Sequence, residues 1–182
     1  MTEIADRYRS LADAFEAKVA AVPPDAWSNQ SPCDEWDARQ LVGHVIDVHQ
    51  MMLKPLDRTL SDAPPVEDDP LGAFKSARAD VEAVLDDPAL AGTEYDGQFG
   101  KSKVENTIDQ FMAFDLVVHG WDLARATGQD ETIDPVEVDR TWDAAQGFGE
   151  NMRTYGVTGP VVDVPDGASK QDRLLGLLGR QP

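Results

Sequence analysis

The chain has 182 residues, of which 41% are hydrophobic and 7% aromatic, which fits one domain with a sizeable core. Its 34 acidic and 16 basic residues give a formal net charge of -18, which argues against nucleic-acid binding and against anionic membranes as partners. With one cysteine, no signal-like N-terminus and no membrane-length apolar stretch, we expect a cytoplasmic protein.

The first third of the chain predicts two amphipathic helices joined by an ordered loop. Apolar residues at helical spacing predict the first helix over 2–22, and Pro23 ends it. Asp34 is the expected N-cap of a second helix, which begins at residue 35 or 36, runs to about residue 54 and ends or kinks at Pro55. One face of this second helix is apolar and carries Leu41, Val45, Val48 and Met52.

The middle of the chain alternates between polar connections and helical segments. Residues 61–70 are rich in Asp, Glu and Pro, which indicates an exposed loop, and a helical period returns over 71–85. Residues 86–100 hold a proline and several glycines, so we expect a long connection there. The apolar segment 104–127 predicts a long helix that Gly128 caps at its C-terminus.

The C-terminal part predicts two shorter helices. Asp134-Pro135 supplies an N-cap acid and a first-turn proline for a helix that fades near Tyr155-Gly156. Residues 157–164 are expected to be extended, and residues 169–178 to form a short closing helix. Several amphipathic helices, little strand signal and long connections together predict an all-α helix bundle, formed by one domain over 1–182.

Two polar side chains interrupt the apolar segment 104–127 on one helical face. Asp115 and His119 lie four residues apart, so a regular helix places them one turn from each other. Burying an unpaired carboxylate is costly, so something must compensate it, and a divalent cation is one candidate. The face traced through the segment consists of Ile108, Met112, Asp115, His119, Asp122 and Ala126.

A third ligand must come from another helix, and the sequence offers His44 or His49. His44 lies at the edge of the apolar stripe of the second helix. His49 is about 140° further round that helix, so the two cannot face one point, and we interpret His49 as a hydrogen-bonded core residue. The trio His44, Asp115 and His119 suits Zn, Ni, Fe or Mn and leaves coordination positions open, as catalytic sites do.

Spacing alone leaves other interpretations of these residues open. A buried histidine is often a hydrogen-bonded core residue, and an Asp–His pair at this spacing can be a helix-surface ion pair. Asp47 and Asp122 each follow a candidate histidine by three residues and could fix its tautomer. Cys33 precedes a helix, a position that can activate a thiol, but we expect it to be inert. Arg39 and Arg125 are candidate anion contacts, although surface salt bridges are the commoner role.

Three stretches of the chain resemble a known family. Residues 31–45 (SPCDEWDARQLVGHV) and 115–128 (DLVVHGWDLARATG) are similar to the second-helix and fourth-helix signatures of the DinB-like superfamily, in the branch of mycothiol-dependent maleylpyruvate isomerase. Residues 172–182 are similar to the tail of many actinobacterial members. The resemblance implies a DinB-like four-helix bundle that holds a divalent metal ion, zinc or nickel foremost. The ligands that it implies are His44, Asp115 and His119.

The chemistry that the resemblance implies is activation of a low-molecular-weight thiol, which would be mycothiol in actinobacteria, by the metal ion. The thiolate would add to an electrophilic substrate and give a transfer or, after elimination, an isomerisation. Two other functions stay open. One is a non-catalytic metal- or ligand-binding bundle that serves as a dimeric sensor or stress protein, and the other is a metal-dependent hydrolase. Exposed apolar helix faces are compatible with a homodimer.

Overall fold

The computed structural model of the protein describes residues 2–97, 100–149, 153 and 158–182. The chain divides into two compact units, residues 1–130 and residues 131–182. Helices dominate both units, and the described strands form one two-stranded sheet, which confirms the all-α prediction. That residues 1–182 form a single domain stays a prediction. None of the described helices is long and apolar enough to cross a bilayer.

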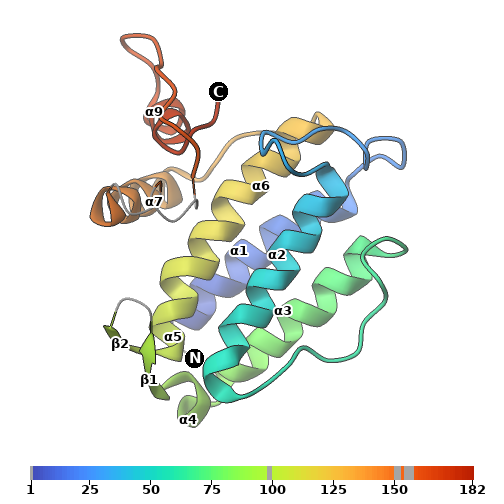
Figure 1. Cartoon of the computed structure of the whole chain (residues 1–182), viewed down its shortest axis with the longest axis vertical. Helices are drawn as coiled ribbons and strands as arrows, with labels where there is room; N and C mark the ends of the chain where they lie inside the picture. The colour runs from blue at the N-terminus through green and yellow to red at the C-terminus, as the bar shows by residue number, and fades with distance from the viewer. Residues whose placement is uncertain (1, 98–99, 150–152, 154–157) are drawn as a thin grey trace. The chain divides into compact units, whose positions relative to one another are not determined.

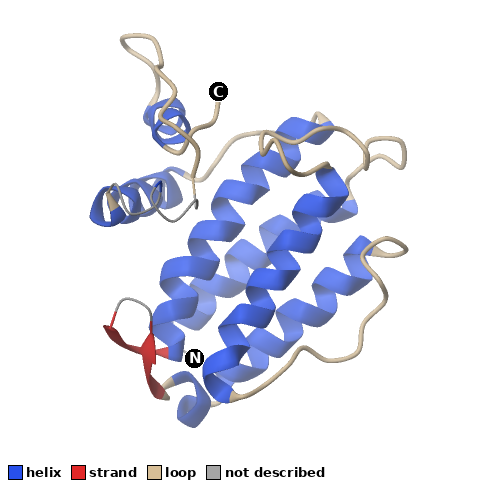
Figure 2. Cartoon of the chain, in the orientation of Figure 1, coloured by secondary structure: helices blue, strands red, loops and turns tan. Residues whose placement is uncertain are grey.

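Four long helices of the first unit form the predicted bundle (Figure 1). They are α1 (Glu3–Ala20), α2 (Ala38–Leu53), α3 (Pro70–Asp86) and α6 (Ala113–Thr127). Helices α1 and α2 each pack against both α3 and α6, so every long helix has two neighbours around one core. Figure 2 shows that helices make up nearly all regular structure of this unit. The largest fully buried side chains of the unit include Trp121, Tyr8, Phe15, Phe74, Leu41 and Ile108.

The start of α2 differs from the sequence prediction by a few residues. Its N-cap is Asp37, not Asp34, because Asp37 forms a reciprocal capping box with Gln40. The Asp37 carboxylate accepts from the Gln40 amide at 2.8 Å, and the Gln40 side chain accepts from the Asp37 amide at 3.0 Å. Asp34 and Trp36 therefore belong to the turn that precedes the helix. At the other end, Pro55 lies in a short 3-10 turn, Lys54–Leu56.

The connection between α3 and the next long helical segment is more ordered than the sequence suggested. It contains α4 (Pro88–Ala91) and an antiparallel hairpin of β1 (Glu94–Gly97) and β2 (Gly100–Lys103), with Tyr95 opposite Ser102. Both strands are short and mostly polar, so they lack the apolar alternation by which strands are recognised. The Tyr95 hydroxyl and the Thr107 hydroxyl lie 2.7 Å apart, which ties the hairpin to the helix that follows.

The apolar segment 104–127 is helical throughout, as predicted, but it is not one regular α-helix. It begins with α5 (Val104–Thr107), passes through a π-helical turn, Ile108–Met112, and continues as α6. Gly128 ends α6 in the left-handed conformation, with φ 71°, which confirms the predicted cap. π-helical turns are rare and occur often at functional sites, and this one lies just before Asp115.

Two described helices of the second unit begin where the sequence predicts. Helix α7 (Pro135–Phe148) is capped by Asp134, and α9 (Lys170–Leu177) by Ser169. Helix α7 ends at Phe148, earlier than predicted, because Gly149 leaves the helical conformation with φ 53°. Tyr155 and Gly156, where the sequence predicted its end, lie outside the described residues. Residues 158–164, the described part of the segment expected to be extended, form no strand. A Cβ atom on Gly176 would come within 2.6 Å of the Val162 carbonyl oxygen, so only glycine fits there.

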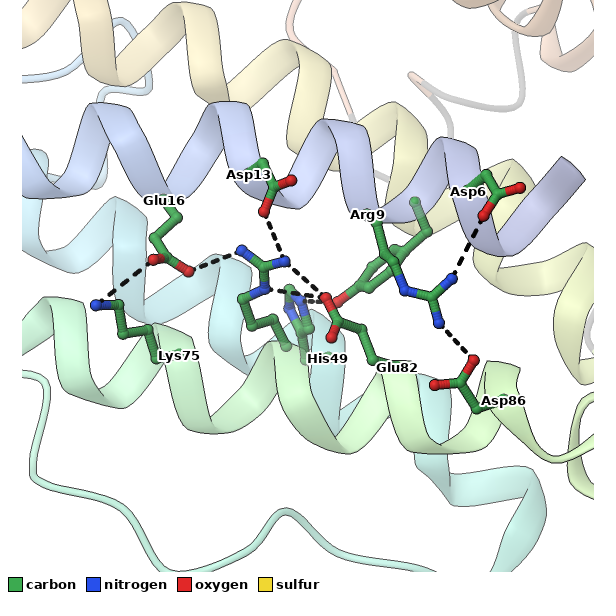
Figure 3. A network of polar contacts seen from close by, with 10 residues as sticks. Asp6, Arg9, Asp13, Glu16, His49, Lys75, Glu82 and Asp86 are labelled. Carbon is green, nitrogen blue, oxygen red and sulfur yellow. Dashed lines mark hydrogen bonds and ion pairs between the residues drawn. The ribbon is translucent and has the colours of Figure 1, made fainter. Parts of the chain in front are cut away.

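A dense network of charged side chains joins α1 to α3 (Figure 3). The Arg78 guanidinium of α3 contacts Asp13 at 2.8 Å, Glu16 at 2.7 Å and Glu82 at 2.7 Å, and Lys75 adds a further contact to Glu16. The Arg78 side chain is only 14% exposed. Three carboxylates thus surround one half-buried cation, and the pKa of the guanidinium is raised although burial alone would lower it.

Candidate metal centre

The three predicted ligands come together between α2 and α6. His44 lies near the middle of α2, and Asp115 and His119 lie one turn apart on α6. Asp115 Oδ1 is 3.7 Å from His44 Nε2 and 3.4 Å from His119 Nε2, and one ligand atom from each residue lies within 4.8 Å of the others. His44 is the most exposed of the three side chains, at 29%, and His119 the least, at 8%.

The second carboxylate oxygen of Asp115 indicates whether a cation fits between the three residues. Asp115 Oδ2 is buried and has no hydrogen-bond partner among the described residues. Such an atom loses its hydration without compensation, which is costly in an apolar surrounding. The nitrogen–oxygen separations in the trio exceed those of ordinary hydrogen bonds. They resemble the ligand–ligand separation of roughly 3.3 Å that tetrahedral zinc imposes on N and O ligands. The donor set therefore fits a divalent cation.

Asp122 fixes the orientation of the His119 ring, as its spacing predicted. His119 Nδ1 lies 2.9 Å from Asp122 Oδ2, and the Asp122 side chain is fully buried. Because Nδ1 donates to this carboxylate, the Nε2 atom faces Asp115 and is available as a ligand. Asp47, the corresponding candidate on α2, does not hold His44 in this way. It lines a hollow beside the cluster, together with His44.

Electrostatics within the cluster favour a charged carboxylate. Burial alone would raise the pKa of the Asp115 carboxyl, but the charges of His119 and His44 and contacts with both imidazoles hold it well below its usual range. Burial alone would lower the pKa of His119, whereas Asp115 and Asp122 raise it well above 6.5. These opposed pKa shifts have one cause, which is that a positive charge beside the Asp115 carboxylate is favourable.

Trp36 is a further residue of the site, which helical spacing in the sequence does not indicate. Its ring stacks on His44, with centroids 4.1 Å apart, and meets the edge of His119 at 5.8 Å. Trp36 precedes the capping residue Asp37, so the capping box at the start of α2 sets where the indole lies. The turn before α2 brings Trp36 close to His44, and helical spacing in the sequence does not reveal this contact.

Cys33 also lies next to the cluster. Its thiol donates to Asp122 Oδ2 at 3.5 Å, so this buried oxygen is shared between Cys33 and His119. Cys33, His119 and Asp122 form a second group whose ligand atoms lie within 4.8 Å of one another. Since the two groups have His119 in common, we treat them as one polar cluster with Asp122 at its buried end.

The remaining predicted residues lie apart from the trio. His49 is fully buried, its Nδ1 donates to the Val45 carbonyl at 2.7 Å, and its Nε2 lies 2.9 Å from the Tyr8 hydroxyl, which confirms a hydrogen-bonded core histidine. The Arg39 guanidinium lies 5.2 Å from the centre of the Trp27 ring. The guanidinium of Arg125 lies at the same distance from Trp121.

Comparison with known proteins places the cluster inside a recognised sequence family. Residues 8–124 match the profile of the mycothiol maleylpyruvate isomerase N-terminal domain, a span that includes His44, Asp115 and His119. Two uncharacterized proteins of Mycobacterium tuberculosis are similar over 92% of this chain and 92% of their own length. They are MT0763 of strain CDC 1551 / Oshkosh and Rv0738 of strain ATCC 25618 / H37Rv, each 29% identical over 177 residues. No solved structure matches the chain.

Proposed function

The chain belongs to the mycothiol maleylpyruvate isomerase N-terminal domain family, and from this we propose that it is a metal-dependent enzyme acting on a low-molecular-weight thiol. In this proposal His44, Asp115 and His119 bind a divalent ion, with zinc or nickel as the first choices. The thiol, mycothiol in the family, is transferred to an electrophilic substrate or serves its isomerisation. The observation that carries the metal-binding part is the buried Asp115 oxygen, which has no hydrogen-bond partner within the described part of the chain.

A cation in this position would supply a positive charge that favours the deprotonated, nucleophilic form of a thiol. Three protein ligands leave room for such a molecule, as is typical of catalytic rather than structural sites. The most exposed ligand, His44, also lines the hollow beside the cluster, which offers an approach for small molecules.

The surrounding side chains have separate roles in this proposal. Asp122 holds the His119 ring so that Nε2 faces Asp115. Trp36 covers one face of the His44 ring and limits its rotation. Asp115 keeps a negative charge between the two imidazoles, which strengthens binding of a dication. The thiol loses its proton to solvent, and its sulfur forms the new bond to the electrophilic carbon. In a transfer this bond displaces a leaving group. In an addition it opens a π bond, whose electron pair takes a proton from solvent, and loss of the thiolate then completes an isomerisation.

A conjugation assay with matched variants tests the proposal. Zinc- or nickel-loaded protein is incubated with mycothiol and a chromogenic electrophile, and the rate above the uncatalysed background is recorded. We expect a rate that needs both metal and thiol, that falls at least about 100-fold in Asp115→Asn and that persists in His49→Gln. Hydrolysis of an ester without thiol would indicate a metal hydrolase instead. Bound metal without either reaction would indicate a non-catalytic bundle.

A further inference from the structure

A hollow of about 560 Å³ lies beside the candidate metal centre. Its walls come from α2, α3 and the segment 60–67, and both Trp36 and His44 belong to the lining. A volume of this size is typical of pockets for small molecules. Because one of its lining residues is a candidate ligand, a molecule that reacts at the centre has room to extend along α2 into this hollow.

The outer wall of the hollow is anchored at both ends. The Ser61 amide and hydroxyl both donate to the Asp80 carboxylate of α3, at 2.7 and 2.8 Å. The Leu60 amide donates to the side-chain oxygen of Gln50 at 2.9 Å. At the far end, the guanidinium of Arg39 donates to the carbonyl of Glu67. The segment is therefore fixed across α2 and α3, and the hollow between these anchors is preformed.

The formally charged residues that line the hollow are acidic, among the residues that the structure describes. Asp47 and Glu67 are its acidic lining residues, while no lysine or arginine lines the hollow among the described residues. Neither carboxylate has an ion-pair partner in the part of the chain that the structure describes. The other polar lining residues are His44, Gln40, Ser61 and Ser76. The rest of the lining consists of Trp36, apolar residues and one glycine.

The charges of the lining decide which ligands it accepts. Ionised carboxylates only accept hydrogen bonds, so a ligand group beside them must donate. A second anion brought next to Asp47 and Glu67 would be repelled, and the net charge of -18 on the whole chain adds to this repulsion. An ammonium group would be attracted to both carboxylates, and a hydroxyl group could donate a hydrogen bond to them.

We propose that this hollow holds the end of the thiol or its acceptor that is remote from the reacting atom, and that it selects ammonium- or hydroxyl-bearing molecules over carboxylates. This inference rests on the proposed function, because it assigns the specificity of that same site. Asp47 and Glu67 are the residues that set the selection, and neither belongs to the candidate ligand trio.

Three four-carbon thiols that differ only in their far end test the selection. They are 4-mercaptobutylamine, 4-mercaptobutanol and 4-mercaptobutanoate. Each is titrated into protein loaded with Co²⁺, and binding is read from the thiolate-to-metal absorption band. We expect the amine to bind about tenfold more tightly than the carboxylate at low salt, with the alcohol between them. The preference should shrink as salt is raised, because exposed charges are screened.

Two double variants separate the hollow from general charge effects. Asp47→Asn/Glu67→Gln should reduce the preference to about twofold or less, since the nearby repulsion and attraction are gone. Glu94→Gln/Asp96→Asn removes the same two charges from exposed positions on β1 and should leave the preference intact. Should the first variant fail to fold, the single variants Asp47→Asn and Glu67→Gln, each compared with Glu94→Gln, make the same test with one charge removed.

The possible results distinguish this inference from the proposed function. Equal affinity for the three thiols, or preference for the carboxylate, would overturn the inference while the thiol bands support metal-bound thiol. A preference that is unchanged in Asp47→Asn/Glu67→Gln would also overturn it. Absence of a thiol band with every probe, on protein that holds Co²⁺, would overturn the proposed function and the inference with it.

Discussion

Helix α2 carries two histidines five residues apart that have opposite surroundings. His49 is neutral and fully satisfied, because it donates to Val45 and lies 2.9 Å from the Tyr8 hydroxyl, and it packs edge-on against Phe74. His44 lies 3.7 Å from Asp115, whose second oxygen has no hydrogen-bond partner among the described residues. The two residues are of the same type, so their different roles follow from how deeply each is buried and which groups each contacts.

The same contrast holds for the charged groups around each histidine. On the α1–α3 side, Arg78 is surrounded by Asp13, Glu16 and Glu82 at hydrogen-bond distance, so the network is complete without any added ion. On the α2–α6 side, Asp115 meets two imidazoles at distances longer than hydrogen bonds. The complete network serves the stability of the bundle, and the incomplete cluster is where a ligand would complete the bonding.

Zinc should stabilise the protein through the incomplete cluster, and this is the largest effect we expect. At a free zinc concentration 1,000 times the dissociation constant, the gain in unfolding free energy is about 4 kcal/mol. Urea unfolding with and without zinc measures it. Asp115→Asn should abolish most of the gain because it removes the anionic ligand, and His49→Gln should retain it. An equal gain in Asp115→Asn would place the ion elsewhere.

Breaking the complete network should destabilise the fold without affecting metal. Arg78→Met leaves three carboxylates close together without their shared cation, and we expect a loss of about 3 kcal/mol in unfolding free energy. The comparison protein is Arg78→Lys, which keeps the charge but not the fork of donors. Zinc binding by folded Arg78→Met should match the unaltered protein. A loss of zinc binding would show that the two regions are not independent.

His49 should make the bundle sensitive to mild acid. Burial lowers the pKa of its imidazole from 6.5 to about 4. Above pH 6.5 both folded and unfolded chains are neutral there, so His49 has no effect. As the pH falls from 6.5 towards 4, only the unfolded chain takes up the proton, and stability falls by about 2 kcal/mol at pH 5. The difference in unfolding free energy between the unaltered protein and His49→Gln, followed from pH 7.5 to pH 5, isolates this contribution from the carboxylates.

Asp122→Asn should produce the smallest of these effects. The amide keeps an oxygen that accepts from His119 Nδ1 but lacks the negative charge, so we expect zinc affinity to fall about tenfold. Competition with a chromogenic chelator measures the change. Asp47→Asn, which alters the carboxylate three residues after His44, should leave affinity within about twofold because Asp47 lines the hollow. A larger loss in Asp47→Asn than in Asp122→Asn would reverse the roles assigned to the two residues.

Periodicity and end signals in the sequence sufficed for the long helices and for selecting His44, Asp115 and His119, which the structure brings together. Helical spacing predicted Asp115 and His119 on one face, and His44 was selected because it lies at the edge of the apolar stripe of its helix. That the three bind a metal ion stays a prediction. Trp36 could not be assigned to the site from spacing, since its stacking on His44 depends on the Asp37 capping box.

Other features required the tertiary structure for related reasons. The π-helical turn Ile108–Met112 has no sequence pattern that separates it from an α-helix. Its mixture of apolar and polar residues would also fit an α-helical turn. The hollow needs the segment 60–67 to lie across α2 and α3, and its composition indicated only an exposed loop. That Asp115 Oδ2 is buried without a hydrogen-bond partner among the residues described by the structure likewise depends on three-dimensional packing.

Metal content of the protein purified without a histidine tag tests the central claim most directly. Elemental analysis is done on the unaltered protein, on His119→Ala and on His49→Gln, each after incubation with zinc, nickel or manganese and removal of excess ion. We expect about one ion per chain in the unaltered protein and in His49→Gln, and none in His119→Ala. No bound ion in any of the three would contradict it, and His44, Asp115 and His119 would then be a buried polar network.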